Sequence, residues 1–319
     1  MASHYSHRPV LLSESVACLD PRSDDVIVDG TVGGGGHAAA ILERIGPHGC
    51  VVALDRDPEA LEAARSHLAE YGERVRFVHA SFRRLSAVLE ELDVPRVDGV
   101  LLDLGVSSPQ LDRAERGFAF AAEGAGTAPL DMRMDPTAGE TAADLLARLS
   151  GEELEQSFRA FAELPGSRRL AAAIVDARAK APLRTTSDLL AVIEGSGVGR
   201  GRRHHPATLV FQALRIAVND ELAALRDGIG AAIDALRPGR RVAVLAYHSL
   251  EDRIVKRTFR DEVRGCLCPP AQPVCTCGRQ PRLELVTRRP LRPRDDEVAS
   301  NRRARSARLR AAARLAEAS

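Results

Sequence analysis

Glycines and a carboxylate follow the first apolar run of this chain. Residues 26–28 lead into Asp29, and four glycines occupy positions 33–36. Glycine lets the backbone adopt positive φ and lie flat against a ligand. Because a helix starting at Ala38 would point its free N–H groups back at this turn, the segment predicts a cradle for a nucleotide cofactor.

Two further carboxylates end later apolar runs, Asp55 after residues 50–54 and Asp103 after residues 97–102. Ligands of open α/β sheets bind outside the carboxyl ends of the strands, so Asp29, Asp55 and Asp103 are expected at one edge. There Asp55 can accept ribose hydroxyl bonds, and Asp29 can lie near the cationic end of S-adenosylmethionine (SAM). The glycine pattern also matches the dinucleotide fingerprint, so an NAD-dependent oxidoreductase remains an alternative.

The elements that position these residues alternate in type along the first third of the chain. Strands are predicted at 26–29, 50–55, 75–79 and 97–103, with helices at 38–45, 58–68 and 82–92 between them. Such alternation implies right-handed βαβ units and a parallel sheet buried on both faces.

The alternation stops after Gln110 and returns at Pro206. Between them the pattern is helical without a strand, with helices at 141–149, 168–180 and 185–194 and a capping box at 150–153. The later elements are a long helix from 206 to about 236, a strand at 242–247, a helix from 249 to about 263 capped by Ser249 and Asp252, and a strand at 283–287. We therefore expect a discontinuous core, residues 1–110 and 206–319, and a helical insert, residues 111–205.

Composition sets outer limits on function. The chain of 319 residues has a net charge of +1 and no apolar run of 18 residues, so no membrane span is expected. Its first residues lack an apolar signal core, which predicts a cytoplasmic protein. Residues 279–319 hold twelve arginines against five acids, a charge of +7. This tail fits either an anionic partner or a solvated terminal helix.

Four of the six cysteines are clustered. Cys266, Cys268, Cys275 and Cys277 form the pattern C-x-C-x6-C-x-C in a Pro-rich stretch. This set could make a tetrathiolate zinc loop, but zinc pairs are usually spaced C-x2-C or wider. The spacing favours the alternative, a reduced flexible loop, and we expect no metal.

Several long stretches together resemble one family, the small-subunit ribosomal RNA (cytosine-N4) methyltransferases, also called RsmH or MraW. The matching stretches are 29–37, 101–112, 116–120, 129–136, 205–208, 211–219, 248–256 and 304–310. They span nearly the whole chain. The segment 235–247, a helix, a Pro-Gly turn and a strand, also resembles the fifth-strand approach of class I methyltransferases.

The resemblance implies a class I SAM-dependent methyltransferase, a Rossmann-like α/β sheet with an inserted all-helical subdomain that recognises RNA. It implies methyl transfer to N4 of one cytidine in the decoding region of 16S rRNA, with the 30S subunit as partner. The monomeric or dimeric state stays open. Carried over by position, the cofactor site comprises Gly35, Gly36 and His37 against SAM, Asp55 on its ribose, Phe82 beside the adenine, and Asp103 and Gln110 completing the pocket.

Cytosine N4 is a weak nucleophile, so a methyltransferase must hold the amine and accept a proton. Ser108, after the fourth strand, could hold the amine, and His248, after a later strand, could accept the proton. His248 and Ser249 have an alternative role as helix N-caps. Candidate phosphate contacts are the tail arginines and Arg116, Arg133, Arg203, Arg215 and Arg253.

Some positions depart from the family pattern, chiefly 161–166 and Leu209-Val210. They lie in or beside the helical insert, which leaves open a diverged paralogue that methylates another cytosine-containing RNA or nucleoside. A non-catalytic RNA-binding protein with the same fold is a further alternative.

Overall fold

The computed structural model describes residues 9–120, 125–199, 205–266, 268–269, 272 and 274–316. The chain divides into two compact units. Met1–Gly105 and Leu222–Ser319 form the first, the sheet unit, and Val106–Glu221 forms the second, the helical unit. The sequence placed these breaks near residues 110 and 205 instead. The helix that starts at Pro206 therefore groups with the helical unit and not with the core.

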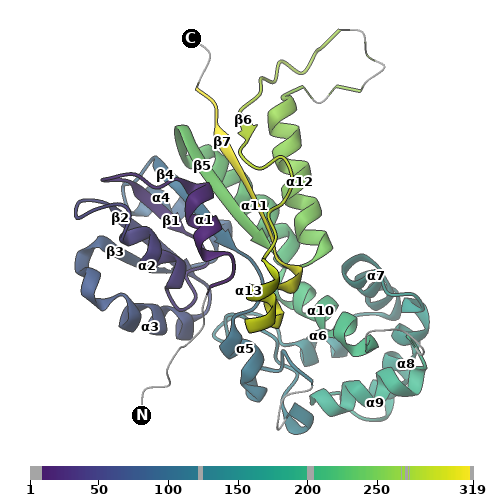
Figure 1. Cartoon of the computed structure of the whole chain (residues 1–319). Coiled ribbons are helices and arrows are strands. Elements are labelled where there is room, and N and C mark those ends of the chain that lie inside the picture. Colours follow the sequence, from purple (N-terminus) through teal and green to yellow (C-terminus); the bar gives the residue numbers. More distant parts are fainter. Residues whose placement is uncertain are drawn as a thin grey trace. The chain divides into compact units, whose positions relative to one another are not determined.

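The sheet unit is built on seven strands in the order β3-β2-β1-β4-β5-β7-β6 (Figure 1). They are β1 (Val26–Asp29), β2 (Cys50–Asp55), β3 (Val75–His79), β4 (Val97–Asp103), β5 (Leu236–Ala246), β6 (Leu283–Leu285) and β7 (Arg308–Arg314). The first five strands in this order pair in parallel, and β7 pairs antiparallel with both β5 and β6. The predicted Rossmann-like α/β sheet is confirmed.

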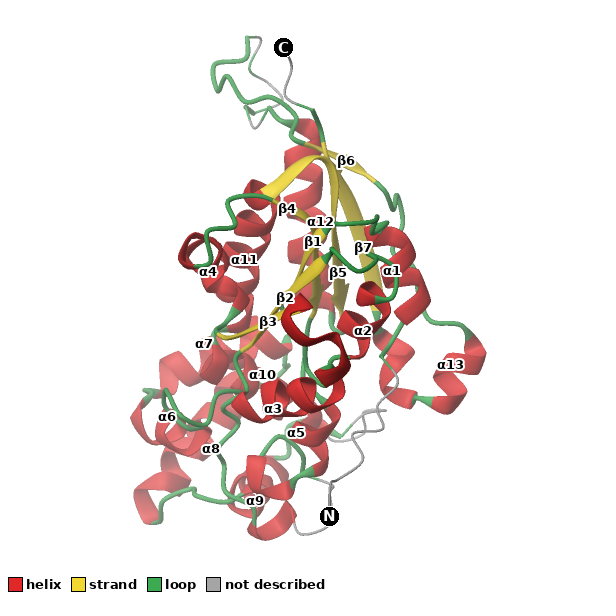
Figure 2. Cartoon of the chain, turned by 90° about the vertical axis from the view of Figure 1, so that its left-hand side faces the viewer, coloured by secondary structure: helices red, strands yellow, loops and turns green. Residues whose placement is uncertain are grey.

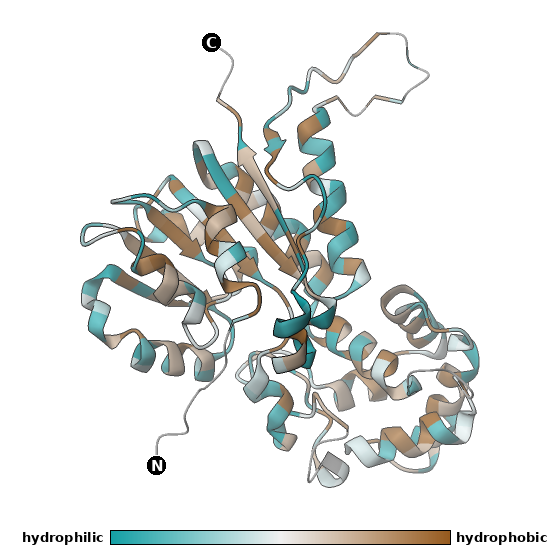
Figure 3. Ribbon diagram, in the orientation of Figure 1, coloured by the Kyte–Doolittle hydropathy of each residue, from teal (hydrophilic) through white to brown (hydrophobic). Residues whose placement is uncertain are grey.

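Helices cover both faces of this sheet. One face packs against α1 (Leu12–Leu19), α2 (Gly36–Leu42) and α3 (Pro58–His67), and the other against α4 (Leu85–Glu91), α11 (Glu221–Ala235) and α12 (Ser249–Arg264). Figure 2 shows α1 and α2 on one side of the strands and α4 and α11 on the other. Alternate residues of one strand serve the two cores: Val52 faces the second and Ala53 the first. This explains why the central strands read as continuous apolar runs, which Figure 3 shows in brown.

The predicted long helix from Pro206 is in fact two helices, α10 (Pro206–Asn219) and α11. Asp220 between them adopts a left-handed conformation with φ 47°. Asn219 is buried and bonds to the chain 85 residues earlier, since it accepts from the Met134 N–H at 2.8 Å and donates to the Met132 carbonyl at 2.7 Å. These long-range bonds fix the end of α10, and no local pattern reveals them.

The basic tail is not a solvated terminal helix. A short helix, α13 (Asp295–Ser300), is followed by β7, whose Leu309, Ala311 and Ala312 are fully buried. The tail therefore completes the sheet between β5 and β6. Within β7 the arginines at 308, 310 and 314 are half-buried and the residues between them are buried.

The helical unit has its own apolar core. Its α-helices are α5 (Ser108–Asp112), α6 (Ala142–Arg148), α7 (Gly151–Ala162), α8 (Ser167–Lys180), α9 (Thr186–Ser196) and α10. Thr141, Ser150 and Thr185 each begin a helix with a reciprocal capping box, and the box at Ser150 was predicted. As expected, the described residues of this unit form no strand. No helix in the described part of the chain is both long and apolar enough to cross a bilayer.

Candidate cofactor site

Two glycines of the turn between β1 and α2 adopt backbone conformations with positive φ. Gly33 and Gly35 have φ of 51° and 84°, values that favour glycine, and Gly35 is the residue before α2. Gly36 opens the helix where an added Cβ would lie 2.3 Å from Pro9 Cγ. The Gly34 carbonyl is 2.7 Å from His67 Nδ1 of α3. The turn is thus a fixed, close-packed surface at the end of β1.

Asp55 at the end of β2 holds this turn in place. Its two carboxylate oxygens accept from the backbone N–H groups of Gly33 and Asp57, each at 2.9 Å. Burial raises the pKa of Asp55 to about 6, although these hydrogen bonds oppose the shift. The carboxylate is therefore oriented by the backbone but has no cationic partner among the described residues.

Asp29 at the end of β1 is almost fully buried. Its Oδ1 accepts from the Thr31 N–H at 3.2 Å, and its Oδ2 has no hydrogen-bond partner in the described structure. Burial raises its pKa to about 7; the nearby Asp103 and Asp55 carboxylates add to the shift, while the bond from Thr31 opposes it. A buried carboxylate oxygen without a partner is costly, so this atom suits a ligand that donates a hydrogen bond or carries positive charge.

Asp103 at the end of β4 joins three elements. Its Oδ1 accepts from the Tyr247 hydroxyl at 2.8 Å, and its Oδ2 lies 3.7 Å from His37 Nδ1 on α2. Its backbone N–H donates to the Thr31 side chain at 2.6 Å. Burial raises its pKa to about 7, the Tyr247 bond opposes this, and Glu251 adds to it.

The three predicted acids thus share one edge of the sheet, and each has a raised pKa. The predicted residues Gly35, Gly36 and His37 lie at the same edge, since Asp55 binds the turn and His37 approaches Asp103. A site that holds desolvated carboxylates without cations favours a positively charged ligand. SAM carries a sulfonium and an ammonium group, so these residues fit it.

Phe82 is half-buried at the start of a short 3-10 turn (Phe82–Arg84) that leads directly into α4, so the helix predicted at 82–92 begins as a 3-10 turn. An added Cβ at Gly228 of α11 would lie 2.4 Å from Phe82 Cδ2, and one at Gly30 would lie 3.2 Å from Phe82 Cβ. The ring is therefore held against α11 and next to the β1 turn. Its role beside the adenine stays a prediction.

Gln110 and Ser108 belong to the helical unit. Gln110 is buried and forms a capping box with Ser107, whose N–H it accepts at 3.0 Å. Ser108 is half-buried in the first turn of α5. The capping box gives Gln110 a local structural role, and the cofactor contact of Gln110 and the catalytic role of Ser108 stay predictions.

His248 is the N-cap of α12, so the capping alternative is confirmed for this residue. Its Nδ1 accepts from the Glu251 N–H at 3.4 Å, and its Nε2 lies 3.1 Å from Glu251 Oε1. The other Glu251 oxygen accepts from the His248 N–H at 3.1 Å. The predicted cap by Ser249 and Asp252 is wrong by one residue. Transfer of a proton to His248 stays a prediction.

Several of the predicted phosphate contacts bond within the protein. Arg116 is buried and donates to the Met134 carbonyl at 3.0 Å. Arg133 pairs with Asp131, Arg215 with Glu221, Arg282 with Glu262, and Arg308 and Arg310 with Asp252. Arg203 lies outside the described residues. Because these side chains bind carboxylates or carbonyls, the charge of the tail overstates what is available to an anion.

Sequence reasoning missed two residues of the site, Thr31 and Tyr247. Tyr247 follows β5 just as Asp103 ends β4, and the two strands pair with Asp103 opposite Leu245. A polar aromatic residue at the carboxyl end of a strand that neighbours Asp103 was the available signal. The Thr31 side chain accepts a hydrogen bond from the Asp103 backbone, and no sequence signal indicated that contact.

The chain closely matches known proteins. Residues 4–315 match a family model described as the MraW methylase family. The chain is 52% identical over 313 residues to the ribosomal RNA small subunit methyltransferase H of Syntrophotalea carbinolica, covering 98% of each chain. It is 51% identical over 314 residues to the protein of the same name from Geobacter sulfurreducens, covering 98% of this chain and 99% of that one.

Proposed function

Because the chain belongs to the MraW methylase family, we propose that it methylates N4 of a specific cytidine in the 16S rRNA of the small ribosomal subunit. The protein is a methyltransferase and SAM is its cofactor. The relatives are named as ribosomal RNA small subunit methyltransferases, which supports the small-subunit rRNA as the substrate class. The cytosine N4 position in the decoding region rests on the family resemblance of the sequence.

The observation that carries the proposal is the edge of the sheet with Asp29, Asp55 and Asp103. When bound there, SAM supplies a methyl group activated by the sulfonium charge. We assign Asp55 to the ribose hydroxyls, because both of its oxygens are already oriented by the glycine turn and Asp57. The partnerless oxygen of Asp29 suits the ammonium group.

Methyl transfer needs an aligned amine and a group that takes its proton. The chain holds Asp103 in position through Tyr247 and the backbone bond to Thr31. We keep Ser108 and His248 as candidates for holding the amine and accepting the proton. In the sheet unit, the Nδ1 of His248 accepts from the Glu251 N–H, and its Nε2 lies 3.1 Å from Glu251 Oε1.

The RNA contact surface includes α12. Arg253, Arg257, Arg260 and Arg264 are spaced four, three and four residues apart, which places them along one face of the helix. Arg257, Arg260 and Arg264 line a hollow of about 270 Å³, together with Asp261, Val263 and Leu285. Arginines along a helix face suit the phosphates of RNA and position it without reading its sequence. We assign recognition of the target cytidine to the helical unit, as the family resemblance implies.

Methyl-labelled SAM, the purified protein and 30S subunits that lack the modification test the proposal. Digestion to nucleosides and mass spectrometry should find labelled N4-methylcytidine from one site of 16S rRNA, and Asp55→Asn should reduce the label about 10- to 100-fold when SAM is limiting. Label in another RNA or in a free nucleoside would support the diverged paralogue instead. SAM binding without any labelled product would support a non-catalytic RNA-binding protein.

A further inference from the structure

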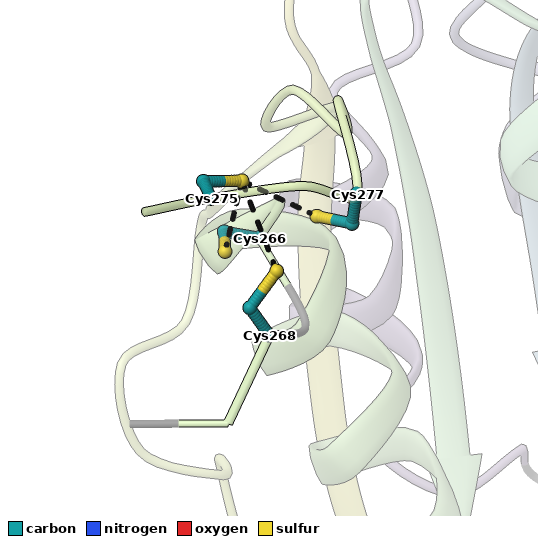
Figure 4. Close-up of side chains that lie close together, drawn as sticks. All are labelled: Cys266, Cys268, Cys275 and Cys277. Atoms are coloured by element: carbon teal, nitrogen blue, oxygen red, sulfur yellow. Dashed lines mark hydrogen bonds between the residues drawn. The ribbon is translucent and has the colours of Figure 1, made fainter. Parts of the chain in front are cut away.

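The loop between α12 and β6 brings four thiols together. Cys266 and Cys275 have their Sγ atoms 3.4 Å apart, Cys268 and Cys275 3.9 Å, and Cys275 and Cys277 3.5 Å. All four sulfurs lie within 4.8 Å of one another (Figure 4). None of the four cysteines forms a disulfide. The two C-x-C pairs therefore face each other as one compact cluster.

The size of the cluster matches a single tetrahedral metal ion. Zinc binds thiolates at about 2.3 Å, so the sulfurs of a Zn(Cys)4 site lie about 3.8 Å apart. The three measured separations, 3.4, 3.5 and 3.9 Å, bracket that value. An iron–sulfur cluster places several iron atoms between its cysteines and spreads their sulfurs further apart. The cluster is thus the right size for one ion.

The base of the loop is closed independently of the thiols. The Arg282 N–H donates to the Glu262 carbonyl at 2.8 Å, and the Glu262 carboxylate pairs with Arg279 and Arg282 at 2.9 and 2.6 Å. Gly265, with φ 68°, lies so close to the chain at Pro281 that an added Cβ would be 2.5 Å from its nitrogen. The two loop ends are therefore held side by side, which lowers the entropy cost of bringing the cysteines together.

A hydroxyl group also lies beside the sulfurs. The Oγ1 atom of Thr276 is 4.0 Å from the Cys268 Sγ. Polar groups next to a ligand atom orient it for metal binding. Since Cys275 and Cys277 are exposed, the thiols do not gather to fill an apolar core.

We propose that Cys266, Cys268, Cys275 and Cys277 bind one Zn²⁺ ion as a closed tetrathiolate site. Binding forms four Zn–S bonds and releases the four thiol protons to solvent. With four protein ligands the ion has no open position, so its role is to order the loop beside the arginine face of α12. The narrow C-x-C spacing favours a metal-free loop when each pair of cysteines is considered alone. In the folded loop the two pairs face each other, so together they offer four sulfur ligands to one ion.

The first test measures metal in the full-length protein purified without chelators. Elemental analysis should find about one zinc per chain, and Co²⁺ exchange should give the visible bands of tetrahedral cobalt with thiolate charge transfer. The double variant Cys275→Ser/Cys277→Ser should lose the metal and these bands. The control variant Cys50→Ser, at a cysteine outside the cluster, should keep both. Zinc content that stays the same in the double variant would overturn the proposal.

A second test needs no variant. Mass spectrometry after brief alkylation should show the four cluster cysteines protected in the zinc-loaded protein, exposed by a strong chelator, and protected again after zinc is restored. Cys18 and Cys50 should not respond. Equal alkylation of the cluster cysteines with and without added zinc would overturn the proposal. Both readouts are independent of methylation, so this proposal and the proposed function fail separately.

Discussion

Acidic residues lie at both ends of the parallel strands; Asp25 and Asp98 at the amino end meet arginines, whereas the three acids that end β1, β2 and β4 do not in the described structure. There Arg240 pairs with Asp25 and donates to the Asp98 carbonyl at 3.0 Å, and Arg237 pairs with Asp98 at 2.9 Å. At the carboxyl end, Asp29, Asp55 and Asp103 have no arginine or lysine partner among the described residues.

The two ends therefore serve different purposes. The acids at the amino end complete internal ion pairs, and the Asp98 carboxylate also accepts the N–H of Val26 at 3.0 Å, which anchors the start of β1. The acids at the carboxyl end carry raised pKa values because the fold desolvates them without neutralising them. Functional sites keep such groups at a cost in stability, since a bound ligand supplies the missing interactions.

The largest effect is expected at the amino end. Arg240→Met should lower the free energy of unfolding by about 3–5 kcal/mol, because it leaves buried Asp25 without a cationic partner, whereas Asp98 keeps Arg237. Urea unfolding would measure the loss. Arg84→Ala breaks the exposed pair with Glu91, where the two side chains are 60% and 62% exposed, and should cost less than about 1 kcal/mol. An equal loss of unfolding free energy in the two variants would contradict the structural role assigned to the ion pairs at the amino end.

At the carboxyl end, substitution should affect binding more than stability. Asp55→Asn should weaken SAM binding by about 10- to 100-fold, which corresponds to a lost charged hydrogen bond of about 1.5–3 kcal/mol. Its unfolding free energy should change little at neutral pH, because removal of a desolvated charge offsets the loss of one of the two backbone hydrogen bonds that Asp55 accepts. Calorimetry gives the affinity and urea unfolding the stability.

Asp98→Asn is the matched control from the other end of the sheet. It should reduce stability and leave SAM affinity unchanged, the reverse of the result for Asp55→Asn. If both variants lost affinity equally, the distinction between the two ends would not hold.

The sequence predicted the carboxyl end well because its signals are local. Each acid ends an apolar strand, and parallel strands of one sheet end at the same edge, so the sequence alone places Asp29, Asp55 and Asp103 together. The amino end could not be predicted in this way. Arg240 contacts Asp25 across 215 positions of sequence, and that pairing depends on β5 lying beside β4.

The same reason explains the errors elsewhere. The end of α10 at Asn219 depends on hydrogen bonds to Met132 and Met134. Strand β7 forms because residues 308–314 pair with both β5 and β6, which are distant in the sequence. The cysteine loop illustrates the limit most clearly. Spacing alone argued against a metal, whereas the proximity of its two C-x-C pairs appears only once the loop ends are fixed by Glu262 and Gly265.

The raised pKa values predict that SAM affinity depends on pH. Asp55 has a pKa of about 6, and Asp29 and Asp103 of about 7, so the ligand-free site takes up protons as pH falls through this range. A cationic ligand favours the deprotonated site. Affinity should therefore rise about three- to tenfold between about pH 6 and pH 8, with release of protons near pH 6.5. Calorimetry in two buffers of different ionisation enthalpy measures both.

Stability without ligand should change in the opposite direction. Because the folded pKa values lie above 3.8, the ordinary pKa of an aspartate, the folded state binds more protons than the unfolded state between about pH 4 and 7. The contribution of these acids to the unfolding free energy therefore falls as pH rises through that window. Asp103→Asn should flatten both pH profiles, and an affinity that does not change with pH would contradict the assignment of a cation to these acids.

The smallest effect is expected from the hydroxyl of Tyr247. Tyr247→Phe removes the hydrogen bond to Asp103 and should cost about 0.5–1.5 kcal/mol of stability above pH 7, where Asp103 is ionised. Since that bond lowers the pKa of Asp103, its loss should raise the pKa further and move the pH midpoint of SAM affinity upward. Tyr71→Phe is the control, because the Tyr71 hydroxyl has no hydrogen bond among the described residues and the ring contact with Arg74 is kept. A midpoint that shifts equally in both variants would show that Tyr247 does not tune the carboxyl end through Asp103.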